Sequence, residues 1–325
     1  MVPTLMRWLR RRRAAAALLT AFAVGSCDEA DVVGLRTSTT FNVGTAIHPL
    51  VVGALSRSYV LHVPRRRPVG TGGVLVSYPL IIVLHGSSAT GADIRNATNM
   101  DSVSEANRWV AAYPNALRGS GGLFPSDWNA GTCCGAAARE NFDDVGFIAS
   151  MINEISRSLP IDAKRVYVVG FSDGGRMAYT VACAMSSQIA GIGVVSGSLK
   201  QEGCLPARPV ALIAIHGTDD PSVPWDDESS TPPPTAPTGL VAAMPPSLQL
   251  WSAVNACKTG TLTQLSTYVE LITLPTCAGA EIAFYSIAGG IHTWPSLKSA
   301  TSSDPDETLA ATALIAQFLR RQTVK

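Results

Sequence analysis

Short apolar runs alternate with amphipathic segments along most of the chain. The runs are rich in Val, Ile, Leu and Ala, which is typical of strands buried on both faces. They lie at 80–84, 110–113, 165–169, 210–215 and 282–287. Segments with helical periodicity lie at 145–159, 175–185, 247–254 and 307–321. This alternation predicts an α/β fold with a mostly parallel central sheet covered by helices on both faces.

The regions outside this alternation set the domain limits. A β-rich run lies at 58–64, and residues 27–55 show little periodicity, so we expect a tether that includes a first strand. Residues 56–325 then form one α/β domain. Residues 226–246 contain six prolines, which predicts a surface loop. This loop is either a tolerated insertion or a rim over the site described below.

The first 26 residues have a different pattern. They contain five arginines and no acidic residue, and the basic run is followed by an apolar stretch at 14–24. This is typical of an export signal, and the stretch is too short for a transmembrane helix. Val24-Gly25-Ser26-Cys27 resembles the lipobox of bacterial lipoproteins. We therefore expect a secreted or envelope protein, in which Cys27 is either lipidated as the first mature residue or part of a simply cleaved signal; in both cases Cys27 lies outside the fold.

Composition and charge narrow the range of partners. With 325 residues, 46% of them hydrophobic, the chain can bury one large core. The formal net charge is +1, and the five arginines of the first 26 residues leave −4 for the remainder. A mildly acidic body gives no electrostatic basis for binding nucleic acid. We expect a monomer without a transmembrane segment.

A Gly-x-Ser-x-Gly motif lies between a predicted strand and a predicted helix. It reads Gly170-Phe171-Ser172-Asp173-Gly174 and separates the strand at 165–169 from the helix at 175–185. A nucleophilic serine needs such a strained strand-to-helix turn, with small residues that let the strand and helix pack closely. An ordinary turn between strand and helix is the alternative. The flanking elements favour Ser172 as a nucleophile.

A serine hydroxyl needs a histidine base, which is in turn oriented by a carboxylate. In the strand-turn-helix context the order along the chain is Ser, acid, His. Of the five histidines, only His292 follows both Ser172 and a plausible acid, and it lies in a glycine-rich loop after a strand. The acid is expected in the loop after the strand at 210–215, where Asp219 and Asp220 are adjacent.

Backbone N–H groups must stabilise the oxyanion that forms during acyl transfer. One is expected from Asp173, which follows the nucleophile, and the other from the loop after the strand at 80–84. We nominate Ser87 in that loop. This chemistry requires neither a metal nor an organic cofactor.

The motifs together resemble the α/β-hydrolase family of polyhydroxybutyrate depolymerase-like and feruloyl esterase-like enzymes, over residues 57–318. They include Gly-Phe-Ser-Asp-Gly-Gly-Arg-Met-Ala at 170–178, His-Gly-Thr-Asp-Asp-Pro at 216–221 and His-Thr-Trp-Pro at 292–295. The resemblance implies an α/β-hydrolase fold and a Ser172–Asp220–His292 triad, because the family pattern places the acid second in the aspartate pair. It implies a carboxylester hydrolase acting first on hydroxyalkanoate oligomers, or alternatively on feruloyl or acetyl esters of plant polysaccharide. An exopeptidase and an inactive envelope binding protein are weaker alternatives.

The remaining cysteines suit an oxidising compartment. Apart from Cys27 there are six, an even number. Cys257 is expected to pair with Cys277, and closing that loop contributes about 3 kcal/mol in the chain-entropy model. Cys183 can pair with Cys204, which leaves Cys133 and Cys134 as a vicinal pair; alternatively, one of these two exchanges partners with Cys183.

Tryptophans near the predicted site are candidates for substrate contact. Trp225 and Trp294 neighbour the predicted acid and base, and Trp128 lies in an Asp-Trp-Asn segment. Packing in the core or rim is the alternative for each. Ile291 and Trp225 depart from the family pattern, which often has Gly and Tyr at these positions.

Overall fold

The structure of the chain is a computed structural model. It describes residues 41–123, 125–225, 236–275, 277–299 and 301–324. The predicted export signal and the lipidation candidate Cys27 lie outside the described residues and stay predictions. The described residues belong to one compact unit.

One ten-stranded sheet organises the described part of the chain, in the order β1-β2-β4-β3-β5-β6-β7-β10-β9-β8. The six strands from β4 to β10 in this order are parallel to one another, and antiparallel pairs form both edges. The strand bounds are β1 Gly44–Val52, β2 Leu55–Val63, β3 Tyr78–Leu84, β4 Val110–Pro114, β5 Ile161–Phe171, β6 Gly191–Val195, β7 Ala211–Gly217, β8 Thr261–Gln264, β9 Val269–Leu274 and β10 Ile282–Ile287. The predicted α/β fold with a mostly parallel sheet is confirmed.

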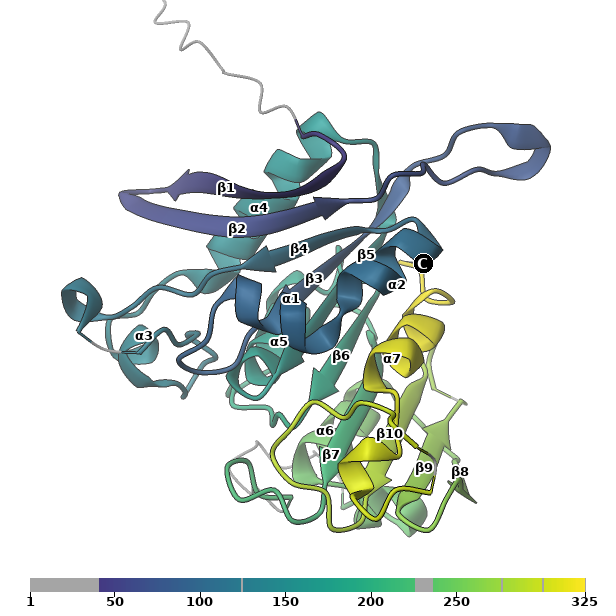
Figure 1. The fold of residues 1–325 in the computed structure, drawn as a ribbon. Coiled ribbons are helices and arrows are strands. Elements are labelled where there is room, and N and C mark those ends of the chain that lie inside the picture. Colours follow the sequence, from purple (N-terminus) through teal and green to yellow (C-terminus); the bar gives the residue numbers. More distant parts are fainter. Residues whose placement is uncertain (1–40, 124, 226–235, 276, 300, 325) are drawn as a thin grey trace, which may run out of the picture. The chain divides into compact units, whose positions relative to one another are not determined.

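Helices cover both faces of the sheet (Figure 1). The α-helices are α1 Gly91–Thr98, α2 Met100–Asn107, α3 Gly135–Arg139, α4 Asp144–Ser158, α5 Asp173–Met185, α6 Pro246–Val254 and α7 Ala311–Leu319, and four short 3-10 helices lie at Thr71–Gly73, Ser120–Gly122, Gly239–Ala243 and Pro305–Glu307. Helices α1, α2 and α7 pack on one face, and α4, α5 and α6 pack on the other.

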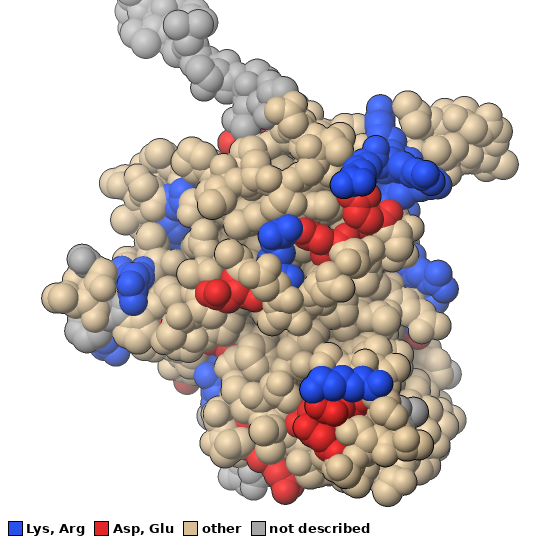
Figure 2. Space-filling model, viewed as in Figure 1, with Lys and Arg blue, Asp and Glu red and all other residues tan. Residues whose placement is uncertain are grey.

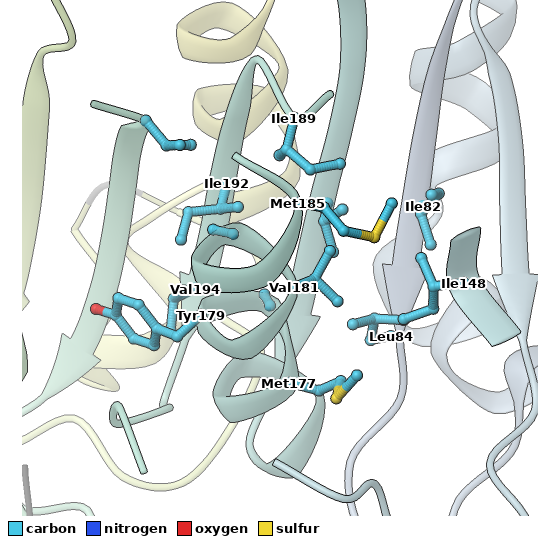
Figure 3. Packing of buried hydrophobic residues seen from close by; sticks show 14 of the residues in the cluster. Ile82, Leu84, Ile148, Met177, Tyr179, Val181, Met185, Ile189, Ile192 and Val194 are labelled. Carbon is cyan, nitrogen blue, oxygen red and sulfur yellow. The ribbon is translucent and has the colours of Figure 1, made fainter. Parts of the chain in front are cut away.

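The two hydrophobic cores follow from the alternation of side chains along each strand. In β3, Ile81 and Val83 face the core under α1, α2 and α7, whereas Ile82 and Leu84 face the core under α4, α5 and α6. Figure 3 shows the second core, where side chains of α5 contact those of β3. Helix α5, which follows the serine turn, is therefore fixed along its length.

The sequence predicted the five apolar strands and the four helices close to their observed bounds. It missed the strands β6, β8 and β9 and the helices α1, α2 and α3. The predicted last helix began too early, because residues 305–307 form a separate 3-10 turn and α7 begins at Ala311. Residues 239–243 of the predicted proline-rich loop also form a 3-10 helix, and residues 226–235 lie outside the described part.

The chain between the predicted signal and the α/β domain contributes to the sheet. Strand β1 falls within the 27–55 segment expected as a tether with a first strand, and it pairs along its full length with β2. Its outward residues Ile47 and Val51 are exposed at the edge of the sheet, which explains why its periodicity is weak.

Three disulfides join the six cysteines of the described residues. They are Cys257–Cys277, Cys183–Cys204 and the vicinal pair Cys133–Cys134. The predicted Cys257–Cys277 pairing is confirmed. Of the two arrangements left open for the other four cysteines, the structure has the vicinal one.

Candidate active site

The turn between β5 and α5 holds Ser172 in a strained backbone conformation. Its φ is 56° and its ψ is −118°, a combination that residues other than glycine rarely adopt. The turn is tight because a Cβ atom on Gly170 would collide with the carbonyl oxygen of Gly174, and one on Gly174 would collide with that of Leu84. The turn therefore presents the Ser172 hydroxyl beyond the carboxyl end of β5.

His292 reaches Ser172 from the loop that follows β10. Its Nε2 atom lies 2.9 Å from Ser172 Oγ. The ring lies against the Phe171 ring, with centroids 4.9 Å apart, and the N–H of Ile291 donates to Asp306 Oδ2 at 3.0 Å. The imidazole is thus oriented by a ring contact on one side and a fixed backbone on the other.

Asp220 completes a hydrogen-bonded chain of three side chains. His292 Nδ1 lies 2.8 Å from Asp220 Oδ2 and 3.0 Å from Oδ1. Burial of Asp220 favours its neutral form, but hydrogen bonds from the Val223 N–H, His292 and the Ser222 N–H outweigh burial, so the pKa of Asp220 lies below its ordinary value. The carboxylate is therefore ionised at neutral pH and can orient a protonated imidazole.

Asp219 is exposed at the same turn. Its Oδ1 accepts a hydrogen bond from the Thr218 hydroxyl at 3.0 Å, and its N–H donates to Gly290 O. No described contact joins the Asp219 carboxylate to His292. The structure therefore brings Asp220, and not Asp219, to the histidine.

The two nominated oxyanion donors lie on either side of Ser172. Ser87 lines the cavity above the serine, and Asp173 begins α5 directly after it. The N–H of the neighbouring Ser88 donates to Ser126 O at 2.9 Å and is therefore engaged elsewhere. The Ser87 hydroxyl donates to Asp127 Oδ1, which fixes this loop, and the role of its N–H stays a prediction.

A buried segment around Trp128 supports the serine turn. The Trp128 backbone N–H donates to Asp173 Oδ2 at 2.7 Å, and its indole N–H donates to His85 O at 2.9 Å. Burial raises the pKa of Asp173 to about 7. His85 is buried as well: its Nδ1 lies 2.7 Å from Gly86 O, its Nε2 accepts from the Ala116 N–H, and burial lowers its pKa.

The structure corrects the predicted substrate contact of Trp128, whereas those of Trp225 and Trp294 stay predictions. Trp128 has no exposed surface, so it packs in the core instead of binding substrate. Trp294 is 9% exposed and donates its indole N–H to Thr312 Oγ1. Trp225 is partly buried against Phe284, with ring centroids 5.2 Å apart. None of the three lines the cavity beside Ser172, because each ring is packed by the elements that hold the site.

A cavity of about 510 Å³ opens beside Ser172 and His292. Its walls are mainly apolar, from α1, the serine turn and the loop after β7, and include Ala89, Ile94, Ala97, Phe171 and Val223. Two charged residues, Asp93 and Arg176, also line it. Neither residue was predicted from the sequence as part of the site. The position of Arg176 in the site could have been predicted from the sequence, because it lies four positions after Ser172 and helical spacing places it on the same side of α5.

One group of side chains in the described residues has metal-ligand character. Ligand atoms of Cys133, Cys134 and Asp173 lie within 4.8 Å of one another. The two sulfurs are joined in a disulfide, whereas a metal binds the thiolate form of cysteine. This group therefore does not fit a metal site.

The sheet, the strained serine turn and the Ser–His–Asp hydrogen-bond chain together define an α/β-hydrolase. Residues 76–232 match the family model described as phospholipase/carboxylesterase. This match spans just under half of the chain, which is therefore similar to the carboxylesterases of the α/β-hydrolase fold, in agreement with the motif resemblance.

Relatives and solved structures agree with this assignment. NocK of Nocardia uniformis subsp. tsuyamanensis, which is named as an esterase, is 26% identical over 270 residues, covering 77% of this chain and 74% of that protein. Feruloyl esterase C of Emericella nidulans is 32% identical over 173 residues, covering 52% of this chain and 57% of that protein. The solved structure of an acetyl xylan esterase from Aspergillus awamori superposes with a TM-score of 0.55 at 14% identity, covering 77% of this chain and 95% of that one; at this identity it supports the fold alone.

Proposed function

We propose that this protein is a serine carboxylester hydrolase that works through a Ser172–His292–Asp220 triad. The observation that carries the proposal is the continuous hydrogen-bond chain from Ser172 Oγ through both ring nitrogens of His292 to a buried, ionised Asp220. Ser172 and His292 line a cavity that is large enough for a small ester.

The geometry supports acyl transfer in two stages. Ser172 Oγ attacks the ester carbonyl carbon, while its proton passes to His292 Nε2. The N–H groups of Ser87 and Asp173 stabilise the oxyanion. The carbon–oxygen bond to the alcohol then breaks, and the alcohol takes the proton from His292. Water repeats the sequence on the acyl-enzyme, so that the acid is released and Ser172 recovers its proton.

The substrates proposed first are hydroxyalkanoate oligomers, which the motif resemblance implies. A cavity of about 510 Å³ with mainly apolar walls accommodates short acyl groups. The second candidate is a feruloyl or acetyl ester of polysaccharide, because the names of several relatives and of one structural neighbour give these activities to those proteins.

We further propose that the protein is exported. The three disulfides suit an oxidising compartment.

No helix in the described ranges has both the length and the apolar character needed to cross a bilayer. On the face shown in Figure 2, charged side chains lie in groups that are basic, acidic or mixed, separated by uncharged surface.

Substitution of the nucleophile tests the proposal. Ser172→Ala is expected to lower kcat for p-nitrophenyl butyrate by several orders of magnitude, on the order of 10⁴-fold or more, with an unchanged circular dichroism spectrum. Ser156→Ala, at an exposed position on α4, is the matched control and should retain full activity. Retained activity in Ser172→Ala would refute the triad.

A substrate panel separates the two candidates. Initial rates would be compared for hydroxybutyrate oligomers, methyl ferulate and acetylated xylan. A higher kcat/KM for methyl ferulate than for the oligomers would favour the second candidate over the first.

A further inference from the structure

Arg176 is a cation in the cavity of the nucleophile that the proposed triad does not use. It lies four residues after Ser172, and a rise of about 1.5 Å per residue places it roughly one turn further along α5. Its side chain lines the same cavity as Ser172 and His292. Arg176 is therefore close enough to contact a substrate bound at the serine.

The guanidinium of Arg176 has only weak acceptors around it. Its Nη1 atom lies 3.5 Å from Cys133 Sγ and 3.4 Å from Cys134 Sγ, and disulfide sulfur is a poor hydrogen-bond acceptor. Its Nε atom is buried without a hydrogen-bond partner. Among the described residues, no carboxylate lies within ion-pair distance of it.

The acidic groups near Arg176 do not neutralise it fully. The charge of Asp173 interacts with Arg176, but this carboxyl is buried and accepts the Trp128 N–H. Because burial raises the pKa of Asp173 to about 7, much of it is neutral at and below that pH. Asp93 lines the cavity, and its Oδ2 is bonded to the backbone N–H and hydroxyl of Thr90.

The rest of the cavity wall provides a low-polarity surrounding for this cation. Ala89, Ile94, Ala97, Phe171 and Val223 contribute apolar side chains. An arginine in such surroundings, held by the vicinal disulfide, is well placed to bind a carboxylate, because its donors match the two carboxylate oxygens.

We propose that Arg176, held against the Cys133–Cys134 disulfide, binds a carboxylate of the substrate, so that the enzyme selects esters carrying a free carboxylate a few atoms from the bond that is cleaved. This inference rests on the proposed function and refines its substrate class. In the dimer of 3-hydroxybutyrate, the carboxylate lies two carbons beyond the ester oxygen. Hydrolysis adds one water across the ester bond and gives two molecules of 3-hydroxybutyrate.

Binding to the inactive Ser172→Ala protein tests the subsite without catalysis. Calorimetry would compare the dimer of 3-hydroxybutyrate with its methyl ester, which lacks the negative charge and is larger by one methyl group. Because a hydrogen bond to a charged group contributes roughly 10- to 100-fold in affinity, the acid should bind at least about 10-fold more tightly than the methyl ester. Adding Arg176→Gln should bring the two Kd values close together, and Arg176→Lys should restore part of the difference.

Kinetics of the active protein provide the second readout. The ratio of kcat/KM for the acid to that for the methyl ester should fall by at least about 10-fold in Arg176→Gln. The matched control is Arg157→Gln, which removes an exposed arginine on α4 and should leave the ratio unchanged.

The two proposals fail in different ways. Equal Kd values for acid and methyl ester on the Ser172→Ala protein, or an Arg176→Gln variant that weakens both ligands equally, would overturn the carboxylate subsite alone. Undiminished ester hydrolysis by Ser172→Ala would overturn the triad, and the carboxylate subsite would then be judged from the effect of Arg176→Gln on the ratio of kcat/KM values.

Discussion

Ser172 Oγ and His292 Nε2 lie 2.9 Å apart, although 120 positions separate the two residues in the chain. The parallel sheet brings them together, because the turn after β5 and the loop after β10 leave the same edge of the sheet. Strands β6 and β7 lie between them in the sheet, and the loop after β7 supplies Asp220. The spacing of the strands thus determines which loops can meet.

The adjacent aspartates allow a paired test of the acid. Asp220→Asn should lower kcat by about 10³- to 10⁴-fold, because Asn cannot stabilise the imidazolium and favours the wrong tautomer of His292. Asp219→Asn should lower it by no more than about 2-fold, since Asp219 is exposed and bonded to the Thr218 hydroxyl. Both would be measured with p-nitrophenyl butyrate. Equal losses in the two variants would contradict the assignment.

Breaking a buried ion pair between Arg57 and Asp144 is expected to destabilise the fold. Arg57 Nη2 lies 2.6 Å from Asp144 Oδ1, both side chains are almost fully buried, and Asp144 Oδ2 accepts the Asn129 N–H. Arg57→Met should lower the free energy of unfolding by about 3–5 kcal/mol, because it leaves an uncompensated buried carboxylate. Urea denaturation would measure this.

A double variant tests the origin of that loss. Arg57→Met combined with Asp144→Leu removes both charges and should recover much of the stability. A double variant less stable than Arg57→Met would show that the ion pair contributes more stabilisation than is needed to offset the cost of burying its two charges.

Asp173 should make stability fall as pH rises. Its pKa is raised from 3.8 to about 7, chiefly by burial. Between these values the folded state retains a proton that the unfolded state has lost, so the free energy of unfolding decreases with pH over this window and levels off above about pH 7. Asp173→Asn keeps an acceptor for the Trp128 N–H and removes this titration.

The predicted difference is measurable by denaturation at two pH values. The loss of stability between pH 4.5 and pH 8 should be smaller in Asp173→Asn than in the parent protein, by up to ~3 kcal/mol. If the two proteins show parallel pH profiles, Asp173 does not titrate in this range.

The central strands and the order of the triad residues along the chain could be predicted from the sequence. The physical reasons are visible in the structure. Apolar strands buried on both faces leave an unambiguous pattern, and only His292 among five histidines follows both Ser172 and the aspartate pair. What the residues alone left open was the choice between Asp219 and Asp220. That choice depends on the direction in which a turn aims each carboxylate, which no local pattern encodes.

Other features were missed because tertiary contacts determine them. Arg176 depends on the cavity around it, and the burial of Trp128 depends on its contacts with His85 and Asp173. Strand β6 has the sequence Gly-Ile-Gly-Val-Val, and its two glycines weaken any strand pattern. They are there because α7 packs directly on them: a Cβ on Gly191 would lie 3.0 Å from Leu319 Cδ2.

This packing leads to a prediction for Gly193. A Cβ there would lie 3.2 Å from both Ile315 Cγ2 on α7 and Val169 Cγ2 on β5, so the larger side chain of Gly193→Val must displace the helix. Although valine favours strands, overpacking should dominate and lower the free energy of unfolding by about 1–3 kcal/mol.

Ile315→Ala removes the opposing side chain and by itself should cost about 2–5 kcal/mol. In that background Gly193→Val should cost much less or become stabilising, because it fills the space left by Ile315. An equal cost of Gly193→Val in both backgrounds, measured by urea denaturation, would show that contact with α7 is not the reason for glycine in β6.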